Sequence, residues 1–206
     1  MSKKSTKKLL FVATCVFTSV ILIISTVGNS WISMDTKVHI TRGSERSVRI
    51  NEGLWKVCIY SENHYQQSSV LTGCNTIEFV TEQRGGTNSE NTIEGWFYAC
   101  RAFSVVACLL SLLAVLFILV DLKRSMEHTR LMVSITYITA AVFIVIAIIL
   151  YTVQFEKATE FASGETLIPV DTDYGWSYIL AWIGLILCGG HSVTVYFVVK
   201  KNPYRI

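Results

Sequence analysis

The chain has 206 residues, of which 51% are apolar and only two are proline. This composition is typical of a protein with several membrane-spanning segments and not of an ordinary soluble domain. The net charge of +3 is the sum of a basic and an acidic group of segments, and it does not indicate nucleic-acid binding.

Four apolar stretches divide the chain, and each approaches or exceeds the roughly 20 residues that a helix needs to cross a bilayer. They are residues 9–27, 102–120, 131–151 and 176–199. Asp, Glu, Lys and Arg are absent from all of them, and His191 is the one imidazole they contain. We therefore predict an α-helical membrane protein with a left-handed four-helix transmembrane bundle, in a single domain over residues 1–206.

Basic residues gather at one end of the predicted helices. They are Lys3, Lys4, Lys7, Lys8, Lys123, Arg124, Arg130, Lys200, Lys201 and Arg205. Only Asp121 and Glu127 oppose them, while the other acids lie in the two remaining loops. The positive-inside rule therefore predicts cytosolic termini, a cytosolic tail at 200–206 and extracellular loops at 29–98 and 155–174.

The N-terminal segment admits a second interpretation. Its lysines, its apolar run and the small residues near Ser25–Ser30 are also features of a cleavable signal peptide. The apolar run is longer than a usual signal sequence, and no small-x-small cleavage site precedes Trp31. These two features favour a retained first helix.

Several segments between the helices have strand character, which predicts a small extracellular antiparallel β-sheet. The predicted strands are 31–40, 47–50, 54–60 and 76–81, with a turn at 42–45 and a polar loop at 83–91. In the second loop, residues 166–170 can add an edge strand, since Pro169 is tolerated where no N–H partner is needed.

The six cysteines separate by location. Cys58 and Cys74 are the two that lie well outside the membrane, and we predict that they form a disulfide, with two free thiols as the alternative. The cysteines within the spans, which are Cys15, Cys108 and Cys188, are interpreted as small packing residues. Cys100 is either a packing residue or a free thiol.

Three kinds of polar or amphipathic side chain near the membrane have two interpretations each. Trp31 and Trp55 suit either the headgroup level or the core of the sheet. Arg101 is costly at a helix end unless it is paired, and the alternative is a side chain that snorkels to water. His191 is a candidate intramembrane polar site, or it donates an interhelical hydrogen bond beside Gly189 and Gly190.

Catalytic and metal-binding patterns are missing from the sequence. The loops contain His39 and His64, but no His/Cys/Asp cluster with metal spacing and no nucleophile elbow. We therefore predict a protein that is not an enzyme and that needs no cofactor.

The pattern of Trp31, Gly53-Leu54-Trp55, Cys58 and Cys74 in the first loop resembles the signature of the claudin superfamily. That group includes claudins, peripheral myelin and epithelial membrane proteins, the lens fibre membrane protein and calcium-channel gamma subunits. Arg101 resembles the arginine that claudins and the lens protein have where the second helix leaves the sheet. Residues 174–182 are similar to the fourth-helix start in the myelin, epithelial and lens members. The spacing between Cys58 and Cys74 is wider than in typical claudins, and the first loop is longer. The chain also has no Asn-x-Ser/Thr sequon, which glycosylated relatives carry.

This resemblance implies a non-enzymatic protein of the plasma membrane, at cell junctions, that contacts itself or a related four-span protein in cis or in trans. The similarity at the fourth helix favours such a junctional or adhesive role. The longer first loop favours an auxiliary subunit of an ion channel. A paracellular pore is a special case of the first role, in which Asp35, Glu45 or Glu78 can attract cations. The lipid bilayer is an expected partner in every case, and nucleic acid in none.

The C-terminal residues Tyr204, Arg205 and Ile206 form a short aromatic-x-aliphatic ending. An extended terminus of this kind can add a strand to a PDZ groove, so a PDZ scaffold is a further candidate partner.

Overall fold

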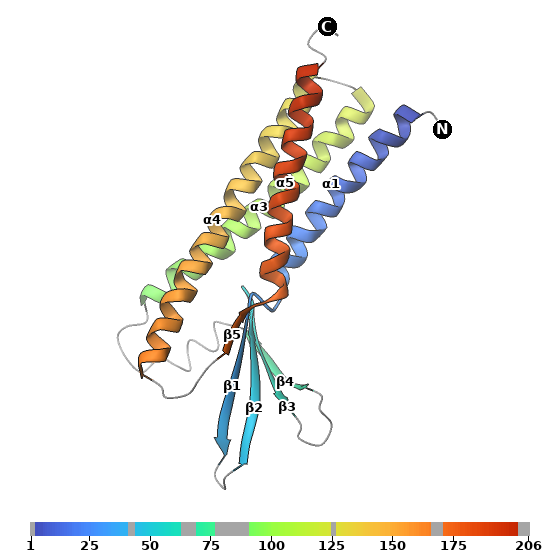
Figure 1. The fold of residues 1–206 in the computed structure, drawn as a ribbon. Helices are drawn as coiled ribbons and strands as arrows, with labels where there is room; N and C mark the ends of the chain where they lie inside the picture. The colour runs from blue at the N-terminus through green and yellow to red at the C-terminus, as the bar shows by residue number, and fades with distance from the viewer. Residues whose placement is uncertain are drawn as a thin grey trace. The chain divides into compact units, whose positions relative to one another are not determined.

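The computed structural model describes residues 3–40, 44–62, 69–76, 91–124, 127–165 and 171–201. These segments form four helices and five strands, which are labelled in Figure 1. Their bounds are α1 Lys3–Val27, β1 Ile32–Ile40, β2 Ser44–Glu52, β3 Lys56–Glu62, β4 Ser69–Thr76, α3 Asn91–Arg124, α4 Glu127–Glu165, β5 Asp171–Tyr174 and α5 Trp176–Lys201.

The chain forms two compact units. The first, called here the bundle unit, comprises Met1–Ile24, Arg101–Ala147 and Leu180–Ile206. The second, called the sheet unit, comprises Ser25–Cys100 and Ile148–Ile179. The five strands therefore lie in the sheet unit, together with the adjoining ends of the four helices.

Each helix contains a segment long and apolar enough to cross a membrane, which confirms the predicted four-helix membrane fold. These segments are Leu9–Val27, Gly95–Asp121, His128–Gln154 and Trp176–Val195. In the bundle unit, small side chains such as Cys15, Ala107, Ala140 and Cys188 are buried, whereas large apolar ones such as Leu116 are exposed. Larger side chains such as Leu22 and Ile144 are buried in this unit as well. Small residues at helix contacts are typical of helices that pack closely in lipid.

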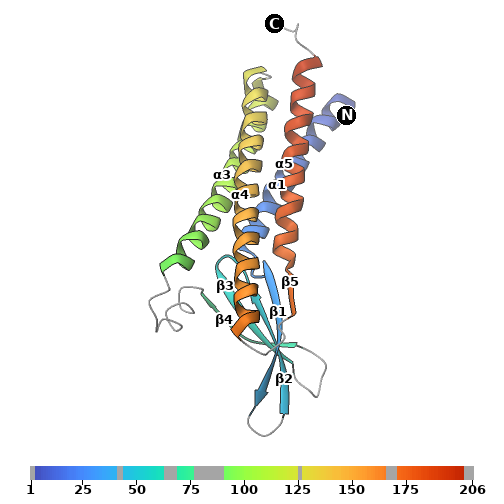
Figure 2. The ribbon, with the colours of Figure 1, turned by 60° about the vertical axis from the view of Figure 1, so that its left-hand side comes forward.

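Neighbouring helices of the bundle unit meet through specific side chains. The rings of Phe103 on α3 and Phe143 on α4 stack at 5.8 Å, and these two helices run side by side in Figure 2. Gly184 on α5 lies against α1, since a Cβ atom there would come within 2.5 Å of the Leu22 side chain. The missing side chain therefore permits a close approach of α5 to α1.

The helices extend beyond the apolar stretches that predict them. The sequence predicts the third helix to end at Tyr151 and a loop to begin at residue 155, but α4 continues to Glu165. Likewise α3 begins at Asn91 and not at residue 102. An apolar stretch marks where a helix lies in hydrocarbon, and polar helix formers continue the backbone pattern beyond it.

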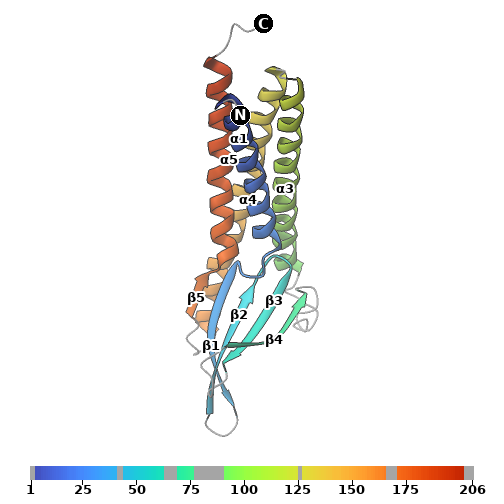
Figure 3. The same ribbon diagram turned by 90° about the vertical axis from the view of Figure 1, so that its right-hand side faces the viewer.

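The strands form one antiparallel sheet in the order β4-β3-β2-β1-β5, shown in Figure 3. β1 and β2 pair over nine residues, from Ile32 opposite Glu52 to Ile40 opposite Ser44. The first three predicted strands therefore correspond to β1, β2 and β3, and Ser44 and Glu45 of the predicted turn belong to β2.

The two edge strands differ from the sequence prediction. The sequence predicts a strand at 76–81, but β4 occupies Ser69–Thr76. It pairs with β3, with a register shift beside Gly73. β5 occupies Asp171–Tyr174 and pairs with β1. Residues 77–81, 83–90 and 166–170 lie outside the described residues. β4 could not be predicted from alternating apolar residues, because its sequence is largely polar and its pairing contains a bulge.

Candidate functional site

Trp31 is the central side chain of the sheet unit. It is completely buried, and its ring packs at 4.9 Å from Tyr151 and 5.9 Å from Tyr178. Its indole N–H donates a hydrogen bond of 2.8 Å to the carbonyl of Ser25. Because α1 ends at Val27, that carbonyl is among the last four of the helix, which have no intrahelical donor. Trp31 is thus a core residue that also caps α1.

Trp55 makes the equivalent bond one residue further along α1. Its indole N–H donates to the carbonyl of Thr26 at 2.8 Å, while 37% of the residue stays exposed. A partly exposed ring with a satisfied polar end suits a membrane interface. The two tryptophans therefore divide between the interpretations that the sequence leaves open, with Trp31 in the core and Trp55 partly outside it.

Gly53 and Leu54 explain the rest of the Gly-Leu-Trp motif. The backbone of Gly53 passes so close to the chain after α1 that a Cβ atom would clash with the Gly28 carbonyl and lie 2.6 Å from Asn29 Cα. The Gly53 N–H also donates to the carbonyl of Lys56 at 2.9 Å. Leu54 is fully buried. Glycine is therefore required at position 53 by close backbone approach.

Cys58 and Cys74 form a disulfide, as the sequence predicts. They lie directly opposite each other on β3 and β4. The side-chain amide of Asn29 donates to the sulfur of Cys58 at 3.4 Å, so this part of β3 is linked to the segment after α1. Cys100 is buried in α3, which favours its interpretation as a packing residue.

Some residues of this site could not be predicted from the sequence. Tyr151 contacts the rings of Trp96 and Phe97 as well as Trp31, at centroid distances of 6.1 and 6.5 Å. The Ser25 hydroxyl donates to the carbonyl of Ser177 at 2.8 Å, which links the end of α1 to the start of α5. Aromatic residues near the ends of the predicted spans are a signal for the ring cluster, but nothing local predicts its partners.

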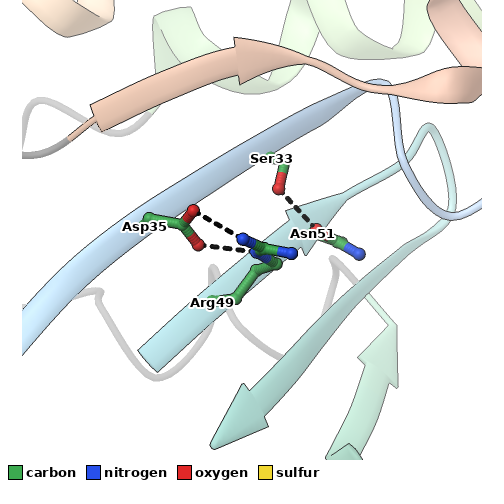
Figure 4. Close-up of polar contacts among 4 residues, drawn as sticks. All are labelled: Ser33, Asp35, Arg49 and Asn51. Carbon is green, nitrogen blue, oxygen red and sulfur yellow. Dashed lines mark hydrogen bonds and ion pairs between the residues drawn. The ribbon is translucent and has the colours of Figure 1, made fainter. Parts of the chain in front are cut away.

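Arg49 and Asp35 form a bidentate ion pair on the sheet, drawn in Figure 4. The Arg49 guanidinium on β2 donates to both carboxylate oxygens of Asp35 on β1, at 2.7 and 2.8 Å. The hydrogen bonds from Arg49 lower the pKa of Asp35 below its ordinary value. Beside this pair, the Ser33 hydroxyl donates to the side-chain oxygen of Asn51 at 2.9 Å.

This pair changes the expectation for a cation-attracting surface. The charge of Asp35 is matched by Arg49, whereas Asp171 lies directly opposite Asp35 on β5 and is exposed. Asp173, opposite Ser33, is exposed too. Nothing is described of the Glu45 side chain, and Glu78 lies outside the described residues.

His191 lies in the bundle unit and joins α5 to α1. It is buried, its Nε2 atom is 2.9 Å from the Thr18 hydroxyl, and that hydroxyl donates to the Thr14 carbonyl at 2.9 Å. The rings of Phe11 and Tyr137 lie at 5.6 and 5.3 Å from the imidazole. These contacts favour an interhelical hydrogen bond over a separate polar site.

Arg101 and the remaining predicted site residues can be placed briefly. Arg101 is only 7% exposed, which excludes a side chain that snorkels freely to water. Among the residues that the structure describes, no group of three or more His, Cys, Asp or Glu side chains can hold a metal ion. Tyr204, Arg205 and Ile206 lie outside them, so PDZ binding stays a prediction.

The fold and this arrangement define a four-span membrane protein with a small disulfide-linked sheet. The chain matches the model of the PMP-22/EMP/MP20/Claudin family over residues 5–190, and it belongs to that family. A search of curated proteins finds no match. Membership of this non-enzymatic family supports a general role in cell junctions or membrane organisation, for a multi-pass protein surrounded by the lipid bilayer.

Proposed function

We propose that this protein organises membranes at cell contacts, through binding of its sheet to another copy or to a related four-span protein. In this proposal the protein lies in the plasma membrane with both termini in the cytosol, and it performs no catalysis. The sheet is then the contacting element on the outer side, and any ion path runs between protomers or between cells.

The observation that carries the proposal is how firmly the sheet is held within its unit. Indole N–H groups of Trp31 and Trp55 bind consecutive carbonyls of α1, and a disulfide joins β3 to β4. A sheet fixed in this way keeps one geometry, and binding then costs little conformational entropy.

The sheet also offers accessible surface for such a contact. Residues Gly73–Thr76 of the edge strand β4 are exposed, and so are Asp171 and Asp173 of the opposite edge strand. An edge strand has backbone groups that can pair with another chain, and exposed acids make a contact sensitive to salt.

A glycan wedge tests this proposal, because the chain has no natural Asn-x-Ser/Thr sequon. Ile77→Thr creates a sequon at Asn75, which lies on β4 and is exposed. A bulky glycan there should block binding through the sheet. The measurement is enrichment of a tagged protein at contacts between two expressing cells, compared with contacts to non-expressing cells.

The matched control is Glu90→Thr, which creates a sequon at Asn88 in the same loop. We expect both variants to gain a glycan, and only the Asn75 glycan to abolish enrichment at contacts. If neither site is glycosylated, the proposed orientation is wrong. If both are glycosylated and enrichment persists in both, the sheet is not the contacting surface.

An auxiliary role on an ion channel is the second candidate, and one observation favours it. The disulfide closes a β3–β4 hairpin with a sequence separation of 16 residues, wider than typical claudins and closer to gamma subunits. Cross-linking followed by native purification distinguishes the two functions. A channel subunit in fixed ratio supports the auxiliary role, and self-association alone supports the junctional one.

A further inference from the structure

One end of the bundle unit gathers an unusual density of positive charge. The starts of α1 and α4 and the ends of α3 and α5 lie together at this end (Figure 1). The described segments there contain nine basic residues, which are Lys3, Lys4, Lys7, Lys8, Lys123, Arg124, Arg130, Lys200 and Lys201. Their acids are Asp121 and Glu127.

One of these two acids already has a partner. The Asp121 carboxylate lies 3.3 Å from Nε of Arg130, and both side chains are partly buried. This pair joins α3 to α4 and cancels its own charge. In the described segments at this end, eight basic residues and one further acid, Glu127, therefore remain.

The start of α1 concentrates four of these charges on a short length of helix. α1 begins at Lys3, whereas its apolar span begins at Leu9. At about 100° and 1.5 Å per residue, positions 3, 4, 7 and 8 fall within a sector of about 140° and within about 9 Å of the span. The helical extension thus holds four lysine positions on one face next to the bilayer surface.

We propose that this basic end of the bundle unit binds the headgroups of anionic phospholipids in the adjoining leaflet. Orientation in the membrane requires only an excess of Lys and Arg on one side. The helical extension of α1 does more, because clusters of four to eight basic residues immediately beside a span attract anionic lipid surfaces. A lipid headgroup fits as the partner, because the lysine positions 3, 4, 7 and 8 directly precede the apolar span and are therefore expected at the depth of the lipid phosphates.

Lipid selectivity of the full-length protein tests this proposal. The protein is reconstituted in phosphatidylcholine bilayers that contain a trace of spin-labelled phosphatidylserine or spin-labelled phosphatidylcholine, and the immobilised fraction of each label is compared. Both leaflets have the same composition, so the result does not depend on orientation. We expect phosphatidylserine to be preferred at low salt, and the preference to weaken at high salt.

The quadruple variant K3Q/K4Q/K7Q/K8Q should lose most of this preference. The matched control K37Q/R42Q/R46Q/R84Q removes four cations from the first loop and should keep it. Equal preference in the wild type and the quadruple variant would overturn the proposal, as would loss of preference in the control. Competition by inorganic phosphate, at matched ionic strength, would also overturn it, because the site would then bind a free anion and not a lipid.

Discussion

Position 53 has no room for a side chain. A Cβ atom at Gly53 would meet the backbone of Gly28 and Asn29, which cannot move without displacing the end of α1. We expect Gly53→Ala to destabilise the protein by roughly 1–3 kcal/mol or more, and to lower its surface level. Gly73→Ala is the control, because nothing lies within 4 Å of a Cβ atom there. Equal surface levels for the two variants would contradict the steric explanation.

The Asp35–Arg49 ion pair predicts that the stability of the protein depends on pH. Because the pKa of Asp35 is lowered in the folded sheet, the pair stabilises the protein above the unfolded pKa of about 3.9 and loses this effect as the pH falls through the folded pKa. Since Arg49 and Asp35 are 53% and 47% exposed, we expect at most about 1 kcal/mol.

Thermal unfolding of the wild type and of Asp35→Asn, in the same detergent, checks this expectation. The wild type should be slightly more stable at neutral pH, and the difference should disappear as the pH falls through the lowered pKa of Asp35. Asp171→Asn is the control, since no arginine is described as bonded to that carboxylate. A difference between Asp35→Asn and the wild type that persists in acid would exclude the ion pair as its cause.

Among the contacts between elements, the hydrogen bonds from Trp31 and Trp55 to the end of α1 should contribute unequally to stability. Trp31→Phe leaves the buried Ser25 carbonyl without a donor, which costs about 1–3 kcal/mol. Trp55→Phe should cost less, because 37% of Trp55 is exposed, whereas Trp31 is completely buried. Unfolding in detergent and surface expression should both rank Trp31→Phe as the more damaging change. The reverse order would contradict this assignment of roles.

The contact between α1 and α5 predicts a second effect at this scale. Thr18→Val removes the hydroxyl that bonds His191, which should cost about 1 kcal/mol of bundle stability in SDS unfolding. Thr139→Val is a matched control, since the Thr139 hydroxyl bonds the Ile135 carbonyl of its own helix. If both variants lose the same stability, the Thr18–His191 bond does not join the two helices energetically.

For the whole molecule, the disulfide is the covalent link on which delivery to the surface should depend. Cys58→Ser or Cys74→Ser should cost roughly 2–5 kcal/mol and lower the surface level. The double variant should behave like either single variant, because each of them already removes the same bond. Peptide mass mapping without reduction gives a direct check, and recovery of either cysteine as a free thiol in the wild type would refute the link.

Features that depend on local chemistry could be predicted from the sequence. Residues 9–27 and 131–151 are apolar over a bilayer's length, and transfer of such a stretch into hydrocarbon is favourable whatever surrounds it. Cys58 and Cys74 were identified as partners because the other cysteines lie in or beside the spans. The Gly-Leu-Trp pattern indicated the family before any partner of Gly53 was known.

Contacts between groups that are far apart in the sequence could be seen only in the folded chain. The bonds from Trp31 and Trp55 to the end of α1, and from His191 to Thr18, join residues far apart in the sequence, and no local pattern encodes them. The pairing of Asp35 with Arg49 depends on the register of β1 and β2, because a shift of one residue moves every side chain to the opposite face. The end of α4 at Glu165 was also not predicted from the sequence. The length of an apolar stretch indicates only the part of a helix in contact with lipid, and backbone hydrogen bonding continues beyond it.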